Sequence, residues 1–387
     1  MCCKNKSFNP PRPSGTPPFK RRGIGATVFS FLLFSFLLSP FQSFASGKTD
    51  EFKADEYIID HILDSYGWHI TTINHREISI PLPIILYDEG NLICFMSSKF
   101  HHGTEAYKGY ALGFTEESKG KIVKLQGEDA HFSGLLKENK EYQWAKVPLD
   151  ISISKNVCSI FISIIILCWI FLSIANIYRR NPHRAPKGFQ NMLEVVILFV
   201  RDEIAIPLIG AHKYKKYLPY LLTLFFFILV NNLMGLVPVF PGGANVTGNI
   251  TVTMILALLT FVIVLFSSNK NYWIHIFNPP GVPWWLKIPV PLMPLIELVG
   301  VLTKPFVLMI RLFANITAGH IIILGFLGLI FIFGNMSTGL GFVASPFSVF
   351  FYLFMGLLEL LVAFIQAFIF TLLTALYIGM AIEEEHA

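Results

Sequence analysis

The sequence predicts an all-α polytopic membrane protein that ends in a long tilted helical hairpin and carries a small extracytoplasmic domain of mixed α/β structure before its first span. Composition and charge lead to this fold class. Hydrophobic residues make up 53% of the 387 residues and charged residues only 14%, well below their share in a soluble domain. Residues 46–156 hold 12 Lys and Arg against 17 Asp and Glu, whereas residues 157–387 hold 12 against 8. An acidic, water-facing domain therefore precedes a basic membrane domain.

Residues 1–45 predict a secretory signal peptide. The basic cluster Lys20-Arg21-Arg22 precedes an apolar run at residues 28–38 and a small-residue cleavage site that ends at Ala45. An uncleaved first membrane helix is the alternative interpretation of the same run. Either interpretation delivers the residues that follow to the outside of the cytoplasm.

Residues 46–155 predict the extracytoplasmic domain. Their polar composition and the strand-like pieces at residues 78–80 and 149–153 indicate a small mixed domain that is rich in β structure. Six histidines fall in it, namely His61, His69, His75, His101, His102 and His131. No two of them have the helical i,i+4 spacing and no cysteine cluster accompanies them, so we expect solvated histidines and no metal site. The five cysteines of the chain indicate no disulfide framework.

The membrane domain, residues 156–387, begins with three predicted spans. Apolar runs place them at residues 157–178, 218–236 and 250–266. Eight Lys and Arg lie between the first two spans, whereas residues 238–248 carry no charge, so the first connection is predicted to be cytoplasmic and the second external. Within the first connection, residues 189–206 alternate apolar and charged groups at helical spacing, which indicates a helix at the membrane surface.

An interfacial turn rich in Trp and Pro, residues 272–289, leads to two long apolar arms at residues 291–334 and 347–382. At about 1.5 Å per residue the first arm measures roughly 65 Å, about twice the thickness of a hydrocarbon core. Because no turn signal occurs inside it, we expect one steeply tilted helix and not two spans. Glycines and a proline within residues 334–346 predict the break between the arms.

The register of this hairpin follows from its turn. With the turn centred near residue 340, residues whose numbers sum to about 680 face one another, because the arms run antiparallel. His320 then meets Glu359, and Asn315 meets Gln366. Each polar group on one arm thereby finds a polar group on the other, as buried polar groups in lipid require.

Arg311 is the most informative residue of the chain, because it is a lone guanidinium in a long apolar stretch. An arginine at bilayer depth costs about 2.5–3.5 kcal/mol on insertion scales and therefore marks a functional site. On a helical wheel of about 100° per residue, Glu297, Lys304 and Asn315 share its direction, whereas His320 points to the opposite side. The structural alternatives for these positions are a snorkelling arginine, a buried acid–imidazole pair, amides that join helices and an interfacial acid–lysine pair.

Four motifs in this region resemble subunit a of the F-type ATP synthase, the membrane stator that faces the rotating c-ring. They are Lys304-Pro305, Arg311-Leu312-Phe313-Ala314-Asn315, Ala318-Gly319-His320 and Gln366-Ala367-Phe368-Ile369-Phe370. The resemblance runs from about residue 189 to the C-terminus. Members of this family usually carry a much shorter N-terminal leader, so the exported domain departs from the family.

The resemblance implies a mechanism in which two offset aqueous half-channels lead to the carboxylates of the c-ring and Arg311 separates the channels. It implies an external half-channel lined by Asn315, His320, Glu359 and Gln366 and a cytoplasmic one near Glu297 and Lys304. In many bacterial members the acid and the imidazole stand the other way round, which keeps one base and one acid. The implied partners are the c-ring, subunit b of the peripheral stalk, the F1 sector and the lipid bilayer, with no nucleic acid.

The resemblance also implies a multi-pass protein of the bacterial inner membrane, with the exported domain outside and the C-terminus in the cytoplasm. The competing function is a secondary ion transporter or channel that uses the same intramembrane charges, which would predict internal repeats with broken helices. The sequence contains no such repeat. It also contains no phosphate-binding Gly-x-x-x-x-Gly-Lys-Ser/Thr motif, so we expect no cofactor and assign any ATP chemistry to partner subunits. The choice between H⁺ and Na⁺ stays open.

Overall fold

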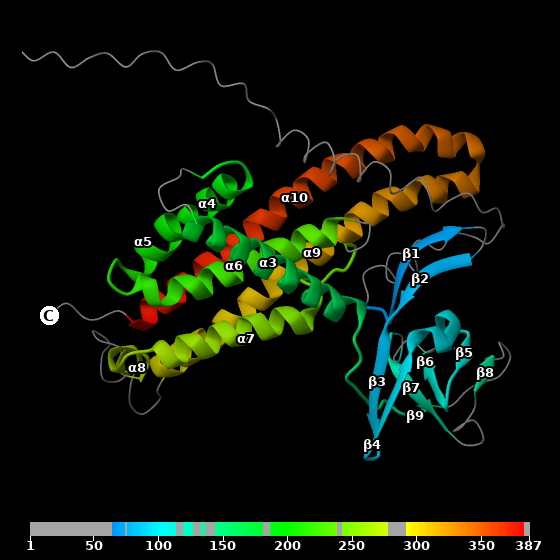
Figure 1. Cartoon of the computed structure of the whole chain (residues 1–387), viewed down its shortest axis with the longest axis horizontal. Helices are drawn as coiled ribbons and strands as arrows, with labels where there is room; N and C mark the ends of the chain where they lie inside the picture. The colour runs from blue at the N-terminus through cyan, green and yellow to red at the C-terminus, as the bar shows by residue number, and fades with distance from the viewer. Residues whose placement is uncertain are drawn as a thin grey trace, which may run out of the picture.

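The computed structural model describes residues 64–73, 76–113, 118, 120–126, 133–135, 144–180, 186–237, 242–277 and 292–382. The predicted signal peptide and the acidic end of the chain lie outside these ranges. Figure 1 shows a small β-rich part at one end of the molecule and a bundle of long helices beside it. The predicted fold class, a polytopic helical membrane protein with a small N-terminal domain, is confirmed.

The N-terminal part, which is predicted to be extracytoplasmic, consists of short strands in antiparallel pairs. The described strands are β1 (Gly67–Ile73), β2 (Arg76–Pro81), β3 (Pro83–Asp88), β4 (Asn91–Met96), β5 (Glu105–Ala106), β6 (Tyr110–Leu112), β7 (Ile122–Leu125), β8 (Gly134–Leu135), β9 (Trp144–Lys146) and β10 (Leu149–Asp150). They pair as β1-β2, β10-β3-β4, β5-β8 and β6-β7-β9. Alternate residues of β3, Ile84 and Leu86, point inward and pack with Phe100, Tyr110 and Ile122. This alternation builds a separate small core.

Two predictions for this part concern its last strand and its six histidines. The strand expected at residues 149–153 is shorter, because only Leu149–Asp150 pairs as a strand with β3. The next residues still follow β3, since the N–H of Ile151 donates to Ile85 O at 2.9 Å and that of Ile153 to Pro83 O at 3.1 Å. Of the six histidines, His61, His75 and His131 lie outside the described residues.

The helices are α3 (Lys155–Arg180), α4 (Phe189–Phe199), the π-helical segment η4 (Val200–Ala205), α5 (Ile206–Ile209), α6 (Tyr214–Leu236), α7 (Ile250–Ser267), α8 (Lys270–Phe277), α9 (Leu292–Met336) and α10 (Thr338–Ile382). Within the described part of the chain, five of them are long and apolar enough to cross a membrane: α3, α6, α7, α9 and α10. The first three contain the spans predicted at residues 157–178, 218–236 and 250–266.

The surface helix predicted at residues 189–206 is present but interrupted. α4 passes into the wider η4 just before Pro207, whose missing N–H removes a hydrogen bond from the ladder. The segment packs against α10: a Cβ added at Gly379 would lie only 2.0 Å from Leu208 O, so glycine is required for this approach. Its placement at the membrane surface stays a prediction.

α9 and α10 form the predicted hairpin, and Figure 1 shows them side by side along much of their length. α9 is one uninterrupted helix of 45 residues that runs through Arg311, as predicted. The break between the arms falls inside the predicted range of residues 334–346 but is much shorter than expected, because only Ser337 separates the two helices and α10 begins at Thr338 and not at residue 347. Two glycines of this segment allow the helices to approach closely, because a Cβ at Gly341 would lie only 2.9 Å from Gly334 Cα.

The C-terminal half of α10 packs closely against α6. Ala363, Ala367, Thr371 and Ala375, spaced four residues apart, are fully buried, and these small side chains let the helix backbones approach closely. The end of α10 is then tied down by polar groups, because Ile382 O accepts hydrogen bonds from Lys213 Nζ at 3.2 Å and Asn269 Nδ2 at 3.1 Å. The hairpin is therefore anchored at the end that lies away from its turn.

Candidate functional site

Arg311 lies exposed on the outer face of α9. No ion-pair partner for its guanidinium occurs among the residues that the structure describes. The neighbouring exposed side chains on this helix, such as Val307 and Ile310, are apolar, and Asn315 is exposed one turn further on. Within the described residues, Arg311 is therefore a positive charge without an acidic partner on a largely apolar face.

His320 points to a different side of the same helix and contacts Glu359 on α10. Its Nδ1 meets Glu359 Oε1, and the two side chains are 18% and 4% exposed. The same Nδ1 lies 3.2 Å from Ile316 O. Gly319 makes the space for this pair, since a Cβ there would come within 3.0 Å of Glu359 Oε1. The predicted facing of His320 and Glu359 is confirmed.

Other contacts along the hairpin keep the same register. The rings of Phe326 and Phe351 stack with centroids 5.2 Å apart, and Lys304 Nζ lies 5.3 Å from the centroid of Tyr377. Gln366 departs from the expectation. Its side chain is buried, whereas Asn315 is exposed, and the structure gives no hydrogen bond between these two described side chains.

Lys304 and Glu297 occupy the half of α9 away from the hairpin turn, and both are half-buried. Lys304 Nζ lies between two aromatic rings, 5.9 Å from the centroid of Tyr272 and 5.3 Å from that of Tyr377, a cation–π arrangement. No direct ion pair joins Lys304 to Glu297 in the described structure. At about 1.5 Å per residue, Lys304 lies roughly 24 Å from His320 along the helix.

A polar cluster beside His320 was missed by the sequence analysis. Thr247 Oγ1 donates to Asn232 Oδ1 at 2.6 Å, and Asn232 Nδ2 donates to Ala363 O at 3.2 Å. Asn231-Asn232 interrupts an otherwise apolar span, and that signal could have been used, because amides in membrane helices mark polar contacts. Thr247 lies in a loop, and no periodicity could have placed it.

Several buried polar atoms of this region have no hydrogen-bond partner within the described residues. They are Glu359 Oε2, the carboxylate oxygen that does not contact His320, together with Asn231 Oδ1 and Asn245 Nδ2. Buried polar atoms of this kind are usually satisfied by water, and here they belong to α6, α10 and the loop between α6 and α7. The described residues contain no group of three His, Cys, Asp or Glu side chains that could hold a metal ion. An imidazole next to a carboxylate, among polar groups that water can reach, is an arrangement suited to proton exchange.

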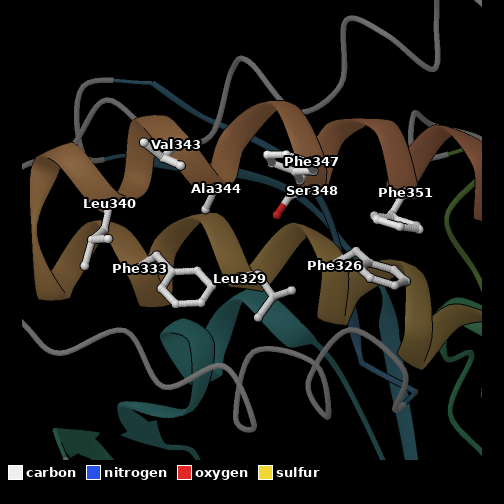
Figure 2. Close-up of a pocket in the computed structure, with 9 residues that line it drawn as sticks. All are labelled: Phe326, Leu329, Phe333, Leu340, Val343, Ala344, Phe347, Ser348 and Phe351. Carbon is white, nitrogen blue, oxygen red and sulfur yellow. The ribbon is translucent and has the colours of Figure 1, made fainter.

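The hairpin near its turn has a different character. Figure 2 shows an apolar groove of about 400 Å³ between α9 and α10, with Phe326 and Phe351 facing each other at one end. Ser348 is the only hydroxyl among the nine lining residues, and none of the nine is titratable. The groove cannot exchange protons, so the candidate site is confined to the polar half of the hairpin.

Two family models match the chain. The model described as ATP synthase A chain matches residues 157–379, and one described as a domain of unknown function matches residues 57–151. The first covers the helices that carry the site. The second covers most of the N-terminal β-rich part.

Individual relatives agree with the first model. An ATP synthase subunit a of Chloroherpeton thalassium is 44% identical over 243 residues, which is 61% of this chain and 68% of the relative. One of Chlorobium phaeobacteroides is 40% identical over 296 residues, 74% of this chain and 82% of the relative. An ATP synthase subunit a of Myxococcus xanthus is 41% identical over 244 residues, which is 62% of this chain and 75% of the relative. The chain therefore belongs to the ATP synthase A chain family, the subunit a of F-type ATP synthase that acts as stator in its membrane sector.

Proposed function

We propose that this subunit supplies two offset proton half-channels to a c-ring and that Arg311 separates them. The observation that carries the proposal is the exposed guanidinium of Arg311 on an apolar face, without an acidic partner in the described chain. Because an unpaired arginine in the bilayer is costly, its counter-charge comes from another subunit. A carboxylate of the c-ring is the group that the family resemblance implies.

Arg311 acts on that carboxylate through charge. In a poorly screened environment, an adjacent positive charge favours the ionised form of a carboxyl group, so a passing c-subunit releases its proton there. The same fixed charge repels a proton that would otherwise pass directly from one half-channel to the other. Both effects require that the charge be uncompensated within its own chain.

The external half-channel is assigned to Asn315, His320, Glu359 and Gln366. Contact between an imidazole and a carboxylate supports proton transfer near neutral pH, since histidine titrates in that range. Asn232 and Thr247 add hydrogen-bonding groups beside this pair. Glu297 and Lys304, at the opposite end of α9, are assigned to the cytoplasmic half-channel.

We further propose that the extracytoplasmic domain lies outside and the C-terminus in the cytoplasm, with the c-ring, subunit b and the F1 sector as partners. Five described spans give an odd number of crossings, and Figure 1 places the β-rich part at the same end as the hairpin turn. Cys94, an exposed native cysteine of that part, allows a direct test. An impermeant thiol reagent should label it from outside in a variant whose other cysteines are serine.

Arg311→Ala tests the proposed role of the charge. We expect the variant to assemble but to lose ATP-driven proton pumping and ATP synthesis, measured in inverted vesicles with a pH-sensitive dye. Val307→Ala, an equally exposed position one turn earlier on the same helix, is the control and should pump normally. Normal pumping by Arg311→Ala would contradict the proposal.

A further inference from the structure

The extracytoplasmic domain is fastened directly to the first span. Asp64 Oδ1 accepts hydrogen bonds from the N–H groups of Ser65 at 3.0 Å and Asn156 at 3.1 Å, and the N–H of Lys155 donates to Ser65 O at 2.9 Å. The first turn of α3 is thus capped by a residue that precedes β1. The start of β1 therefore has a fixed position relative to the membrane helices.

Trp68, the second residue of β1, reaches from this fixed point into the membrane domain. Its side chain is 3% exposed and packs with Ala244 and Val246, which are both fully buried in the loop between α6 and α7. Its indole Nε1 donates to Gly242 O at 3.2 Å. A buried tryptophan needs both an apolar surface and a hydrogen-bond acceptor, and this loop supplies both.

The loop, residues 242–249, has little freedom to adjust. A Cβ at Gly242 would lie 2.2 Å from Val237 O, so the backbone there already touches the end of α6. On its inner side the loop is held by Thr247, through the hydrogen bond to Asn232, and by Thr317 Oγ1, which donates to Gly248 O at 3.5 Å. Trp68 supplies the contact from the outer side.

The same loop lies close to His320. A Cβ at Gly235 would lie 3.3 Å from Ala244 O and 3.8 Å from His320 Nε2, so the loop carbonyl and the imidazole both lie next to this glycine. Glu359 on α10 is the titratable group that faces His320. Near His320, the described residues of α6 and of the loop present only amides, hydroxyls and apolar groups.

We propose that Trp68 is a positioning residue of the external half-channel, which holds the loop 242–249 against His320 from the outside. The exported domain is then a working part of the proton entrance. The proposal rests on the proposed function where it assigns His320 to the proton path. Whether Trp68 keeps the loop closed does not depend on that assignment, so a separate experiment measures loop closure.

The first experiment measures closure of the loop in the assembled complex. In a variant with all native cysteines replaced by serine, Ala244→Cys reports access, because Ala244 is fully buried. An impermeant maleimide added from outside should label it slowly. Trp68→Phe keeps an aromatic ring but loses the indole N–H donor, and it should raise the labelling rate about tenfold. Trp68→Ala, which also leaves a cavity, should raise it about a hundredfold or more.

Phe100→Leu is the matched control. Phe100 lies in the small core of the same domain and does not belong to the cluster around Trp68. Destabilising the domain there should leave the labelling of Ala244→Cys unchanged. If Trp68→Phe and Trp68→Ala label no faster than the parent, or if Phe100→Leu labels as fast as they do, the positioning role is refuted.

The second experiment measures the proton path, as the rate of ATP synthesis against external pH, per assembled complex. Trp68→Phe should shift the midpoint of the external-pH profile and leave the internal-pH profile unchanged. A residue that only supports folding would lower the amount of complex without moving either profile, and an unmoved external profile despite faster labelling would overturn the proposal. Normal pumping by Arg311→Ala would instead overturn the proposed function and leave the labelling result standing.

Discussion

Arg311 lies exposed on α9 without a partner among the described residues, whereas His320, nine residues further along the same helix, is packed against Glu359 and a tight loop. The proposed function gives a reason for this difference. A guanidinium that interacts with a carboxylate of another subunit has to stay accessible, whereas an imidazole and a carboxylate that exchange protons have to be held together inside the chain. On this proposal, one face of α9 interacts with the rotor and the other belongs to the proton path of the stator.

Exchanging the acid and the imidazole should have the largest effect on this comparison. His320→Glu and Glu359→His each create a like pair, two acids or two imidazoles, which resists double ionisation, so each single variant should reduce ATP-driven pumping strongly. The double exchange restores one acid and one base in the same space. We expect it to recover activity with a coupling of about 1–3 kcal/mol in a double-mutant cycle of pumping rates. Additive losses would show that the two residues do not act as a unit.

A methyl group at Gly319 should have an intermediate effect. The added Cβ of Gly319→Ala would lie 3.0 Å from Glu359 Oε1 and 3.1 Å from its Cδ, so the carboxylate must move away from His320. A displacement of this kind costs about 1–3 kcal/mol, and we expect pumping to fall about tenfold. Gly325→Ala on the same helix has nothing within 4 Å of its Cβ and serves as the control. Equal pumping by the two variants would mean that the position of the carboxylate does not matter.

Removing the side-chain amide of Asn315 should have the smallest effect on the stability of the complex. Asn315 is exposed, so Asn315→Ala should change the stability of the complex by less than about 0.5 kcal/mol, measured as thermal inactivation of pumping. Gln366→Ala should cost more, because Gln366 is buried and its removal leaves a cavity. A larger loss of stability at Asn315 than at Gln366 would contradict the division of α9 and α10 into an open and a packed face.

Much of this site could be predicted from the sequence. The lone charge of Arg311, the unbroken first arm and the facing of His320 and Glu359 follow from composition, length and antiparallel geometry, and the structure agrees with the last two. The exact turn could not be predicted. Glycines near residue 340 indicate a long break when they are considered alone, but in the hairpin Gly341 belongs to α10 and lies close to Gly334 on α9.

The sequence by itself determined the class of protein, the number and place of the long apolar helices and the polar pair of the hairpin, because hydropathy and helical periodicity are local properties. Only the tertiary structure decided that Gln366 is buried while Asn315 is exposed, that Asn232 joins the loop through Thr247 and that Trp68 packs against the same loop. Trp68 and Gly242 are separated by 174 residues, and no local pattern links them. Their contact exists because a buried indole needs a large apolar surface and an acceptor, and only the packing of the whole chain brings both to one place.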